Sequence, residues 1–386
     1  HAKSGQWWEN EGQRALANNS VAYKNKPEMG TFMREWLSLY DSKSGERGIF
    51  NRQSAKVQAA KNGRRDADQD FGCNPCSEII LRPYQFCNLS EVVARETDTL
   101  TSLKEKVRLA TILGTFQATL TNFKYLRNIW KANTEQERLL GVSLTGIMDC
   151  PALHKGKQVA DTLEMLRVTA IDANRSMAWE LGIEQSAAIT CVKPSGTVSQ
   201  LVDSASGIHA RHNPYYIRTV RGDNKDPLTQ FLISQGIPSE PDVMKPDSTT
   251  VFSFPMKSPK NAVTRTGMTA IEQLELWLLY QRHWCEHKPS VTISVKENEW
   301  MAVGAWVYEH FDEVSGISFL PFSEHTYQQA PYQDVNADIY KEWAAKMPKN
   351  VDWSLLQEFE KEDTTSGGRE LACTAGVCEI VDIAAA

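Results

Sequence analysis

The sequence has no long hydrophobic run and few cysteines. Its 386 residues are 41% hydrophobic and 23% charged, and no apolar stretch approaches the roughly 20 residues that a membrane-spanning helix needs. Eight cysteines in a chain of this length are too sparse for a disulfide scaffold, so we expect mostly free thiols in a reducing, cytoplasmic setting. These absences argue against a membrane-embedded protein and against a small disulfide-rich secreted domain.

Positive charge and targeting signals are also scarce. The formal net charge is −6, which provides no basic surface for a nucleic-acid backbone. The first residues, from His1 onward, are polar and mixed, unlike a signal peptide. Because the chain starts without an initiator methionine, we interpret it as a fragment of a longer protein.

Hydrophobic periodicity predicts an α/β protein. The polar region 5–70 looks helical, with a turn at 44–48. Apolar residues at steps of three and four predict further helices at 103–130, 159–182, 271–287 and 297–311. Short apolar runs predict strands at 186–192, 215–220, 251–255, 290–295 and 317–321. Alternating strands and helices favour parallel pairing with right-handed crossovers.

An amide, a thiol and a carboxylate occupy alternate positions of the segment Asn-Pro-Cys-Ser-Glu at 74–78. In an extended segment Asn74, Cys76 and Glu78 would point to the same side. Such a set could bind a hydroxylated substrate, abstract a hydrogen atom and move a proton. An ordinary loop with a hydrogen-bonded glutamate is an equally good interpretation of the spacing alone.

The same region contains a Cys-x-x-Cys pair, Cys73 and Cys76. A structural zinc site would need a second pair at similar spacing, and Cys87 stands alone, so we disfavour zinc. His283 and His287 are spaced as an i, i+4 pair on a predicted helix, but no third ligand accompanies them. We therefore expect no metal site and leave Cys73 unassigned.

A loop of small residues, 193–199, follows a predicted strand and precedes a short helix. Amide groups at a helix N-terminus together with hydroxyl groups can bind phosphate, although the loop does not match the Walker pattern. A plain strand-to-helix turn is the alternative. The predicted phosphate-binding residues are Ser195, Gly196, Thr197, Val198 and Ser199.

Two cysteines, Cys373 and Cys378, lie near the C-terminal end with a glycine between them. A pair at this spacing can close a small disulfide and exchange it with other thiols. A flexible glycine-containing tail would let the pair reach a buried site and return to solvent. Metal binding or an accidental pair are the other interpretations.

Taken in order, these blocks resemble the large subunits of ribonucleotide reductases. The resemblance rests on 74–78, on Phe-Cys-Asn-Leu at 86–89, on 193–199 and on the cysteine pair of the tail. Further stretches are similar to the class II, adenosylcobalamin-dependent branch, above all to the monomeric ribonucleoside-triphosphate reductases. They are residues 15–23, 44–52, 141–149, 206–221, 254–259, 289–295 and 327–333.

The resemblance implies the C-terminal catalytic part of a ten-stranded α/β barrel, built from two five-stranded parallel half-sheets with a finger loop at the centre. Cys76 would lie at the fingertip. Residues 1–70 would form a helical segment and the start of a barrel half, 71–348 the catalytic portion, and 349–386 a flexible redox tail. The missing N-terminal half would carry the cysteine partner of Cys87 and much of the effector region, so the isolated chain should be inactive.

The resemblance also implies a chemistry in which adenosylcobalamin provides the radical that generates a thiyl on Cys76. That thiyl would abstract the ribose 3′-hydrogen of a ribonucleoside tri- or diphosphate, while Glu78 accepts the 3′-hydroxyl proton and Asn74 orients the sugar. Cys87 would belong to the reducing dithiol. Cys373 and Cys378 would reduce the spent disulfide, and thioredoxin or a similar dithiol would recharge them.

Several rival interpretations stay open at the level of the sequence. A class I large subunit would need a radical-transfer tyrosine pair, and Tyr215 and Tyr216 are adjacent, although they stand in a stretch similar to class II. An anaerobic glycyl-radical enzyme would need a glycine near the C-terminus, such as Gly376. A non-catalytic zinc- or thiol-binding module and an inert fragment are the remaining alternatives.

Overall fold

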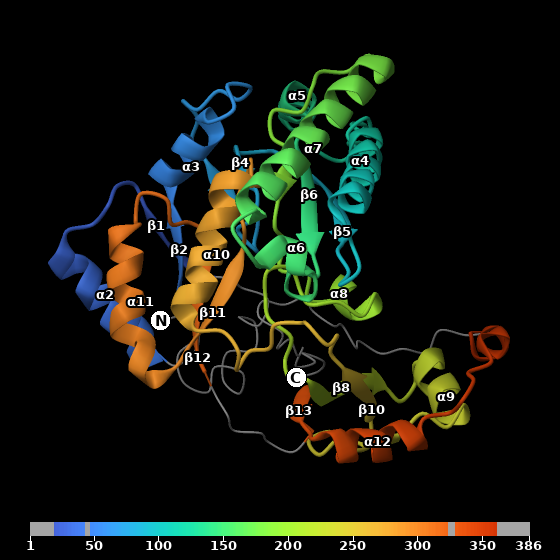
Figure 1. Cartoon of the computed structure of the whole chain (residues 1–386). Coiled ribbons are helices and arrows are strands. Elements are labelled where there is room, and N and C mark those ends of the chain that lie inside the picture. Colours follow the sequence, from blue (N-terminus) through green and yellow to red (C-terminus); the bar gives the residue numbers. More distant parts are fainter. Residues whose placement is uncertain (1–18, 43–46, 323–328, 361–386) are drawn as a thin grey trace.

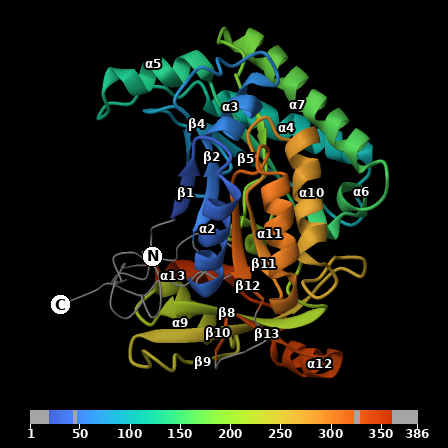
Figure 2. The same cartoon turned by 90° about the vertical axis from the view of Figure 1, so that its left-hand side faces the viewer.

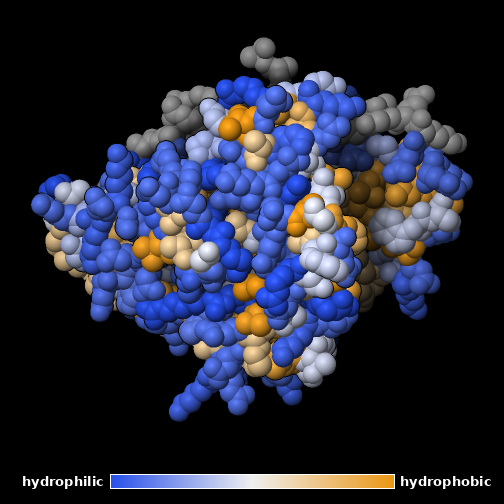
Figure 3. Space-filling model, turned by 90° about the horizontal axis from the view of Figure 1, so that it is seen from above, coloured by the Kyte–Doolittle hydropathy of each residue, from blue (hydrophilic) through white to orange (hydrophobic). Residues whose placement is uncertain are grey.

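The computed structural model describes residues 19–42, 47–322 and 329–360. An α/β part forms the upper portion of the molecule in Figure 1, and a smaller antiparallel sheet lies beneath it. Seen from above, the molecule presents a largely hydrophilic face with small apolar patches (Figure 3). None of the helices in the described ranges has the length and apolarity needed to cross a membrane.

Parallel strands form the centre of the α/β part. Strands β5 (Asn88–Val93), β6 (Leu140–Thr145) and β7 (Thr190–Cys191) are parallel neighbours. All six residues of β6 are buried, as expected for a strand covered on both faces. Strands β11 (Val291–Val295) and β12 (Ile317–Pro321) form a second parallel pair.

A single parallel bridge between Val192 and Pro289 joins these two groups. It places β7 beside the start of β11, so that five parallel strands follow one another in the order β5-β6-β7-β11-β12. This arrangement agrees with the α/β class and parallel pairing predicted from the sequence.

Two further strands run in the opposite direction. β2 (Gly48–Asn51) pairs with β12 in antiparallel fashion through Ile49 and Ile317, and β1 (Ser20–Tyr23) is parallel to β2. Within the described residues β1 and β5 are the outer strands, and the sheet does not close. The α/β fold class is therefore confirmed, whereas the described strands form no ten-stranded barrel.

Helices cover the outer face of this sheet (Figure 2). α4 (Leu100–Gln117) packs on β5, β6 and α7 (Val159–Leu181). α10 (Ala270–His283) packs on β11, and α11 (Trp300–Glu309) contacts α10 and α2 (Met29–Ser42). Capping boxes begin α4 at Thr99 and α10 at Thr269, and they satisfy amide groups that the first helical turn leaves without partners.

Two helices are shorter in the structure than the sequence predicted. The helix expected at 103–130 ends at Gln117, and a separate helix, α5 (Asn128–Glu137), follows after a series of turns. Leu113 and Leu120 are exposed, so the apolar spacing did not correspond to one buried stripe. The helix expected at 271–287 ends at His283, and His287 therefore lies outside it.

The second sheet corrects the expectation of parallel pairing throughout. Its order is β13 (Tyr332–Asp334), β8 (Tyr215–Asp223), β10 (Thr249–Lys257) and β9 (Ser239–Pro241), and every pair is antiparallel. β8 and β10 pair along nine residues each. Because a hydrophobic run alone does not reveal strand direction, the sequence could not separate these strands from the parallel set.

Helices α9 (Pro227–Ser234), α12 (Ala337–Lys346) and α13 (Leu356–Phe359) accompany the antiparallel sheet. Phe231 of α9 packs against Trp353 and Phe359. The beginning of the segment predicted as a flexible tail is therefore folded onto this part of the molecule. The remaining elements are α3 (Arg52–Ala60), β3 (Gly72–Cys73), β4 (Ile80–Leu81), α6 (Pro151–His154) and α8 (Val198–Leu201).

Candidate active site

The segment 74–78 forms the turn of a short hairpin between β3 and β4. The amide of Ser77 donates to the carbonyl of Asn74 at 2.9 Å, and Ser77 has a positive φ of 65°. The side-chain oxygen of Asn74 accepts a hydrogen bond from the amide of Ile79 at 3.0 Å. The extended geometry inferred from alternation is therefore wrong, because local hydrogen bonds bend this segment into a turn.

A second segment, 287–290, holds this turn through three hydrogen bonds. The hydroxyl of Ser290 donates to the carbonyl of Cys76 at 2.6 Å. The amide of Lys288 donates to the carbonyl of Glu78 at 3.0 Å, and the amide of Ile80 donates to Nδ1 of His287 at 3.2 Å. The turn is thus fixed against residues that lie about 210 positions away along the chain.

His287 is itself fully buried, and its Nε2 donates to the carbonyl of Leu140 at 2.9 Å. Burial lowers the pKa of His287 well below its ordinary value, in keeping with a neutral ring whose two nitrogens both have partners. The predicted pairing of His287 with His283 on one helix is wrong, because that helix ends at His283. Within the described ranges no group of three or more histidine, cysteine, aspartate or glutamate side chains could hold a metal ion.

Glu78 is a buried acid with an unused oxygen. Only 1% of the residue is exposed, and its Oε2 has no hydrogen-bond partner. Burial raises the pKa of Glu78, while a hydrogen bond from Asn74 and the positive charges of Lys193 and Lys288 oppose this effect. A carboxyl group whose pKa is raised in this way is suited to accept and return a proton near neutral pH.

Cys76 carries a partly buried thiol beside this acid. Burial raises the pKa of Cys76 to about 11, the negative charge of Glu78 adds to the effect, and Lys193 opposes it. The sulfur is therefore protonated at neutral pH. A thiolate would be the nucleophile or metal ligand, whereas a protonated thiol carries a hydrogen atom that it can give up.

Cys87 lies immediately before β5 and close to the same acid. Burial raises its pKa well above the ordinary value, and Glu78 adds to this. A Cβ atom added to Gly141 of β6 would lie 3.0 Å from the Cys87 sulfur, so the absence of a side chain at Gly141 makes room for the thiol. Cys76, Glu78 and Cys87 thus share one electrostatic environment.

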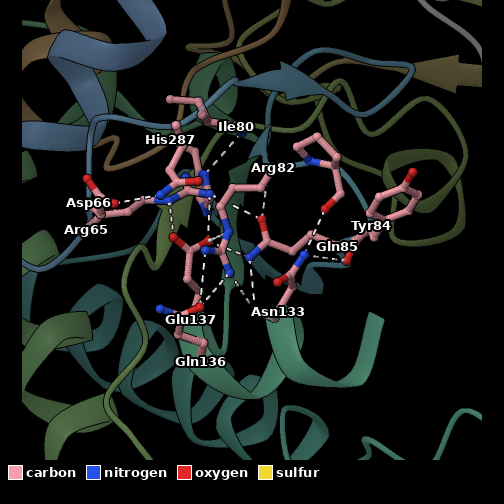
Figure 4. A network of polar contacts seen from close by, with 12 residues as sticks. Arg65, Asp66, Ile80, Arg82, Tyr84, Gln85, Asn133, Gln136, Glu137 and His287 are labelled. Atoms are coloured by element: carbon pink, nitrogen blue, oxygen red, sulfur yellow. Dashed lines mark hydrogen bonds and ion pairs between the residues drawn. The ribbon is translucent and has the colours of Figure 1, made fainter. Parts of the chain in front are cut away.

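A buried polar network fixes the residues that lead to Cys87 (Figure 4). The guanidinium of Arg65 makes two hydrogen bonds to the carboxylate of Glu137, at 3.1 and 2.9 Å. Gln85 donates to the same carboxylate and accepts from the amide of Arg82 at 2.9 Å. Asn133 donates to the carbonyl of Pro83 at 3.0 Å. The network ties 82–85 to the end of α5.

The loop 193–199 lies near the turn, because Lys193 interacts electrostatically with both Cys76 and Glu78. The Lys193 amide donates to the hydroxyl of Ser143 in β6 at 2.8 Å. The hydroxyl of Ser195 donates to Glu91 of β5. Strands β5 and β6 therefore hold the loop in place.

The two serine hydroxyls predicted to bind phosphate are buried and already have partners. Ser195 bonds to Glu91, and the hydroxyl of Ser199 lies 2.7 Å from that of Ser206. The amides of Gly196, Thr197 and Val198 donate no hydrogen bond within the described part of the chain. The backbone amides of this loop, rather than its serine side chains, are therefore available to bind an anion.

Sequence reasoning gave no role to three residues that shape the site, Glu91, Lys288 and Ser290, and none to Lys193 within the predicted loop 193–199. Lys288 and Ser290 lie about 210 positions from the turn, and no local pattern shows that their segment contacts 74–78. The predicted redox pair, Cys373 and Cys378, lies outside the described residues.

No protein-family model matches the chain. Among curated proteins it is 27% identical to an adenosylcobalamin-dependent ribonucleoside-triphosphate reductase of Lactobacillus acidophilus, over 95% of this chain and 53% of the relative. It is 29% identical to the Euglena gracilis protein of the same name, over 87% of this chain and 46% of that protein. The chain therefore spans about half the length of the curated relatives it matches.

Among solved structures, a B12-dependent class II ribonucleotide reductase matches with a TM-score of 0.74 and 22% identity. The match covers 92% of this chain and 54% of the other, and it shows a shared α/β fold. The resemblance found in the sequence is confirmed: over nearly its whole length, this chain is similar to part of the adenosylcobalamin-dependent class II ribonucleotide reductases.

Proposed function

We propose that this chain is the C-terminal catalytic part of an enzyme that reduces ribonucleotides, with triphosphates favoured, to 2′-deoxyribonucleotides through a cysteine radical. The observation that carries the proposal is the pairing of Cys76 with Glu78. A thiol that stays protonated at neutral pH lies beside a buried carboxyl group with an unused oxygen. The names of the similar proteins supply the substrate class.

The cofactor in this proposal is adenosylcobalamin, which supplies a radical through homolysis of its cobalt–carbon bond when it is bound. The residues present fit that chemistry, because Cys76 offers a hydrogen atom on sulfur rather than a thiolate. Once oxidised to a thiyl, Cys76 takes the 3′-hydrogen of the ribose. Glu78 accepts the 3′-hydroxyl proton, and Asn74, whose side chain lies at the same turn, orients the sugar.

We assign the remaining roles from the family resemblance. Cys87 serves as one thiol of the reducing pair, since it shares the environment of Glu78. The amides of Gly196, Thr197 and Val198, within the predicted site 195–199, hold the nucleotide phosphates beside Lys193. Cys373 and Cys378 relay electrons from thioredoxin or a similar dithiol in a reducing, cytoplasmic setting.

We propose that this chain is part of a protein about twice its length, like its curated relatives. Its N-terminal half supplies the partner thiol of Cys87, the nucleotide-effector region and the strands that complete a ten-stranded barrel around the hairpin of β3 and β4. Residues 1–70 begin one barrel half, 71–348 form the catalytic portion, and 349–386 contain the redox tail. The open edges at β1 and β5 are compatible with this.

Replacing Cys76 by serine in the complete protein tests the proposal. We expect adenosylcobalamin-dependent turnover to fall to background, because an O–H bond is a poor hydrogen-atom donor, while nucleotide binding measured by calorimetry persists. Cys73→Ser is the matched control, since Cys73 is a second thiol of the same hairpin, and it should retain turnover. Retained turnover in Cys76→Ser would remove Cys76 from the radical role.

A further inference from the structure

Lys288 is a lysine with no exposed surface. Its Nζ donates to the hydroxyl of Ser315 at 3.1 Å and lies 4.3 Å from the centre of the Phe50 ring. No ion pair within the described ranges includes Lys288. Burying an ammonium group without a carboxylate in direct contact costs free energy. A nearby negative charge would offset part of this cost.

Glu286, two residues before Lys288, pairs with Arg64, whereas Glu78 is an acid whose backbone contacts that of Lys288. The amide of Lys288 donates to the carbonyl of Glu78 at 3.0 Å, so the two residues lie side by side where 287–290 meets the turn. Their side chains interact electrostatically, and the Lys288 ammonium also interacts with Cys73. Glu78 is buried with one unpaired oxygen. The positive charge of Lys288 and the negative charge of ionised Glu78 can therefore stabilise each other.

We propose that Lys288 is a positioning residue that acts through Glu78. Its buried ammonium group stabilises the ionised carboxylate of Glu78, which is the form able to accept a proton. Its amide fixes the backbone of Glu78 through the hydrogen bond to the Glu78 carbonyl. The inference deepens the proposed function and rests on the role of Glu78 given there. Burial removes solvent screening from this interaction, and the partly exposed Lys193 acts on Glu78 in the same direction.

Other ionisable groups act on the same pair. Burial lowers the pKa of Lys288 to about 8, and Glu78 and Cys73 oppose that effect. The ionisable groups around Glu78 and Lys288 are Cys73, Cys76, Cys87, Cys191, Lys193 and His287.

The first test titrates Glu78 directly. Isotope-edited infrared spectroscopy of the full 386-residue chain follows the carboxyl band that Glu78→Gln removes. We expect Lys288→Met to raise the titration midpoint of Glu78 by about one pH unit or more, since loss of a nearby opposite charge disfavours the ionised form. Lys288→Arg keeps the charge and should restore most of the shift. Lys341→Met, which removes a solvent-exposed lysine of α12, is the matched control and should leave the midpoint unchanged.

The second test measures the same coupling from the lysine side. Carbon-13 NMR of labelled lysine ε-carbons follows the signal that Lys288→Arg removes. Because coupling between two sites is reciprocal, Glu78→Gln should lower the midpoint of Lys288 by the same number of pH units. Glu78→Gln keeps the shape of the side chain, so this test decides the matter if Lys288→Met does not fold.

Either of two results would overturn the inference. One is an unchanged Glu78 midpoint in folded Lys288→Met, or an unchanged Lys288 midpoint in Glu78→Gln. The other is a shift in Lys341→Met as large as that in Lys288→Met. Both experiments measure protonation rather than turnover. They therefore test the coupling of Lys288 to Glu78 even if the proposed ribonucleotide chemistry is wrong.

Discussion

At the scale of single residues, the environment of Cys76 decides what its sulfur can do. The thiol lies beside a buried acid, and burial raises its pKa to about 11 although the positive charge of Lys193 opposes this. An ordinary reactive cysteine has a lowered pKa. The tuning at this site therefore favours hydrogen-atom transfer over nucleophilic attack.

This tuning predicts a distinctive pH dependence of alkylation. Below its pKa a thiol reacts through its small thiolate fraction, so the rate at Cys76 should rise about tenfold per pH unit between pH 7 and 10. Mass spectrometry after iodoacetamide pulses measures the rate, with Cys76→Ser identifying the peptide. A plateau reached near pH 8 would contradict the raised pKa.

At the scale of elements, the turn at 74–78 and the segment that leads to Cys87 are held by hydrogen bonds from other elements. The bonds from Lys288 and Ser290 fix the turn, and the network around Glu137 fixes residues 82–85. Buried hydrogen bonds of this kind favour one geometry, because breaking them leaves polar groups without partners.

Removing Glu137 should therefore be costly. Glu137→Ala leaves the buried guanidinium of Arg65 without its carboxylate, and losing one partner of a buried pair typically destabilises by about 3–5 kcal/mol. Urea unfolding of the 386-residue chain measures the change. The control is Glu105→Ala, which breaks a solvent-exposed pair with Arg108 on α4 and should leave the unfolding midpoint almost unchanged. Equal effects of the two variants would refute the buried-network argument.

At the scale of the whole molecule, the described sheet is open at both ends. β5 pairs only with β6, and β1 pairs only with β2, within the described residues. Unpaired edges of this kind favour pairing with additional strands. The chain also spans about half the length of its curated relatives, so the proposed activity requires the rest of such a protein.

We accordingly expect no ribonucleotide reduction from this chain alone. Co-expression with the N-terminal half of the same protein should give turnover that depends on adenosylcobalamin and a dithiol. Deoxyribonucleotide formation measured by chromatography tests this, and Cys76→Ser in the co-expressed complex serves as the inactive control. A folded, complete complex without activity would count against the proposed function.

The sequence by itself determined the α/β class, the boundaries of α7 almost to the residue, and the identity of the chemical groups at 74–78. These properties depend on local hydrophobic spacing and on residue type. Only the tertiary structure decided that 74–78 forms a turn, that Ser195 and Ser199 use their hydroxyls internally, and that β8 and β10 are antiparallel. It also decided that Lys288, some 210 residues away, lies beside Glu78. Such contacts join segments that are distant in the chain, and no periodicity or motif within one segment can encode its partner.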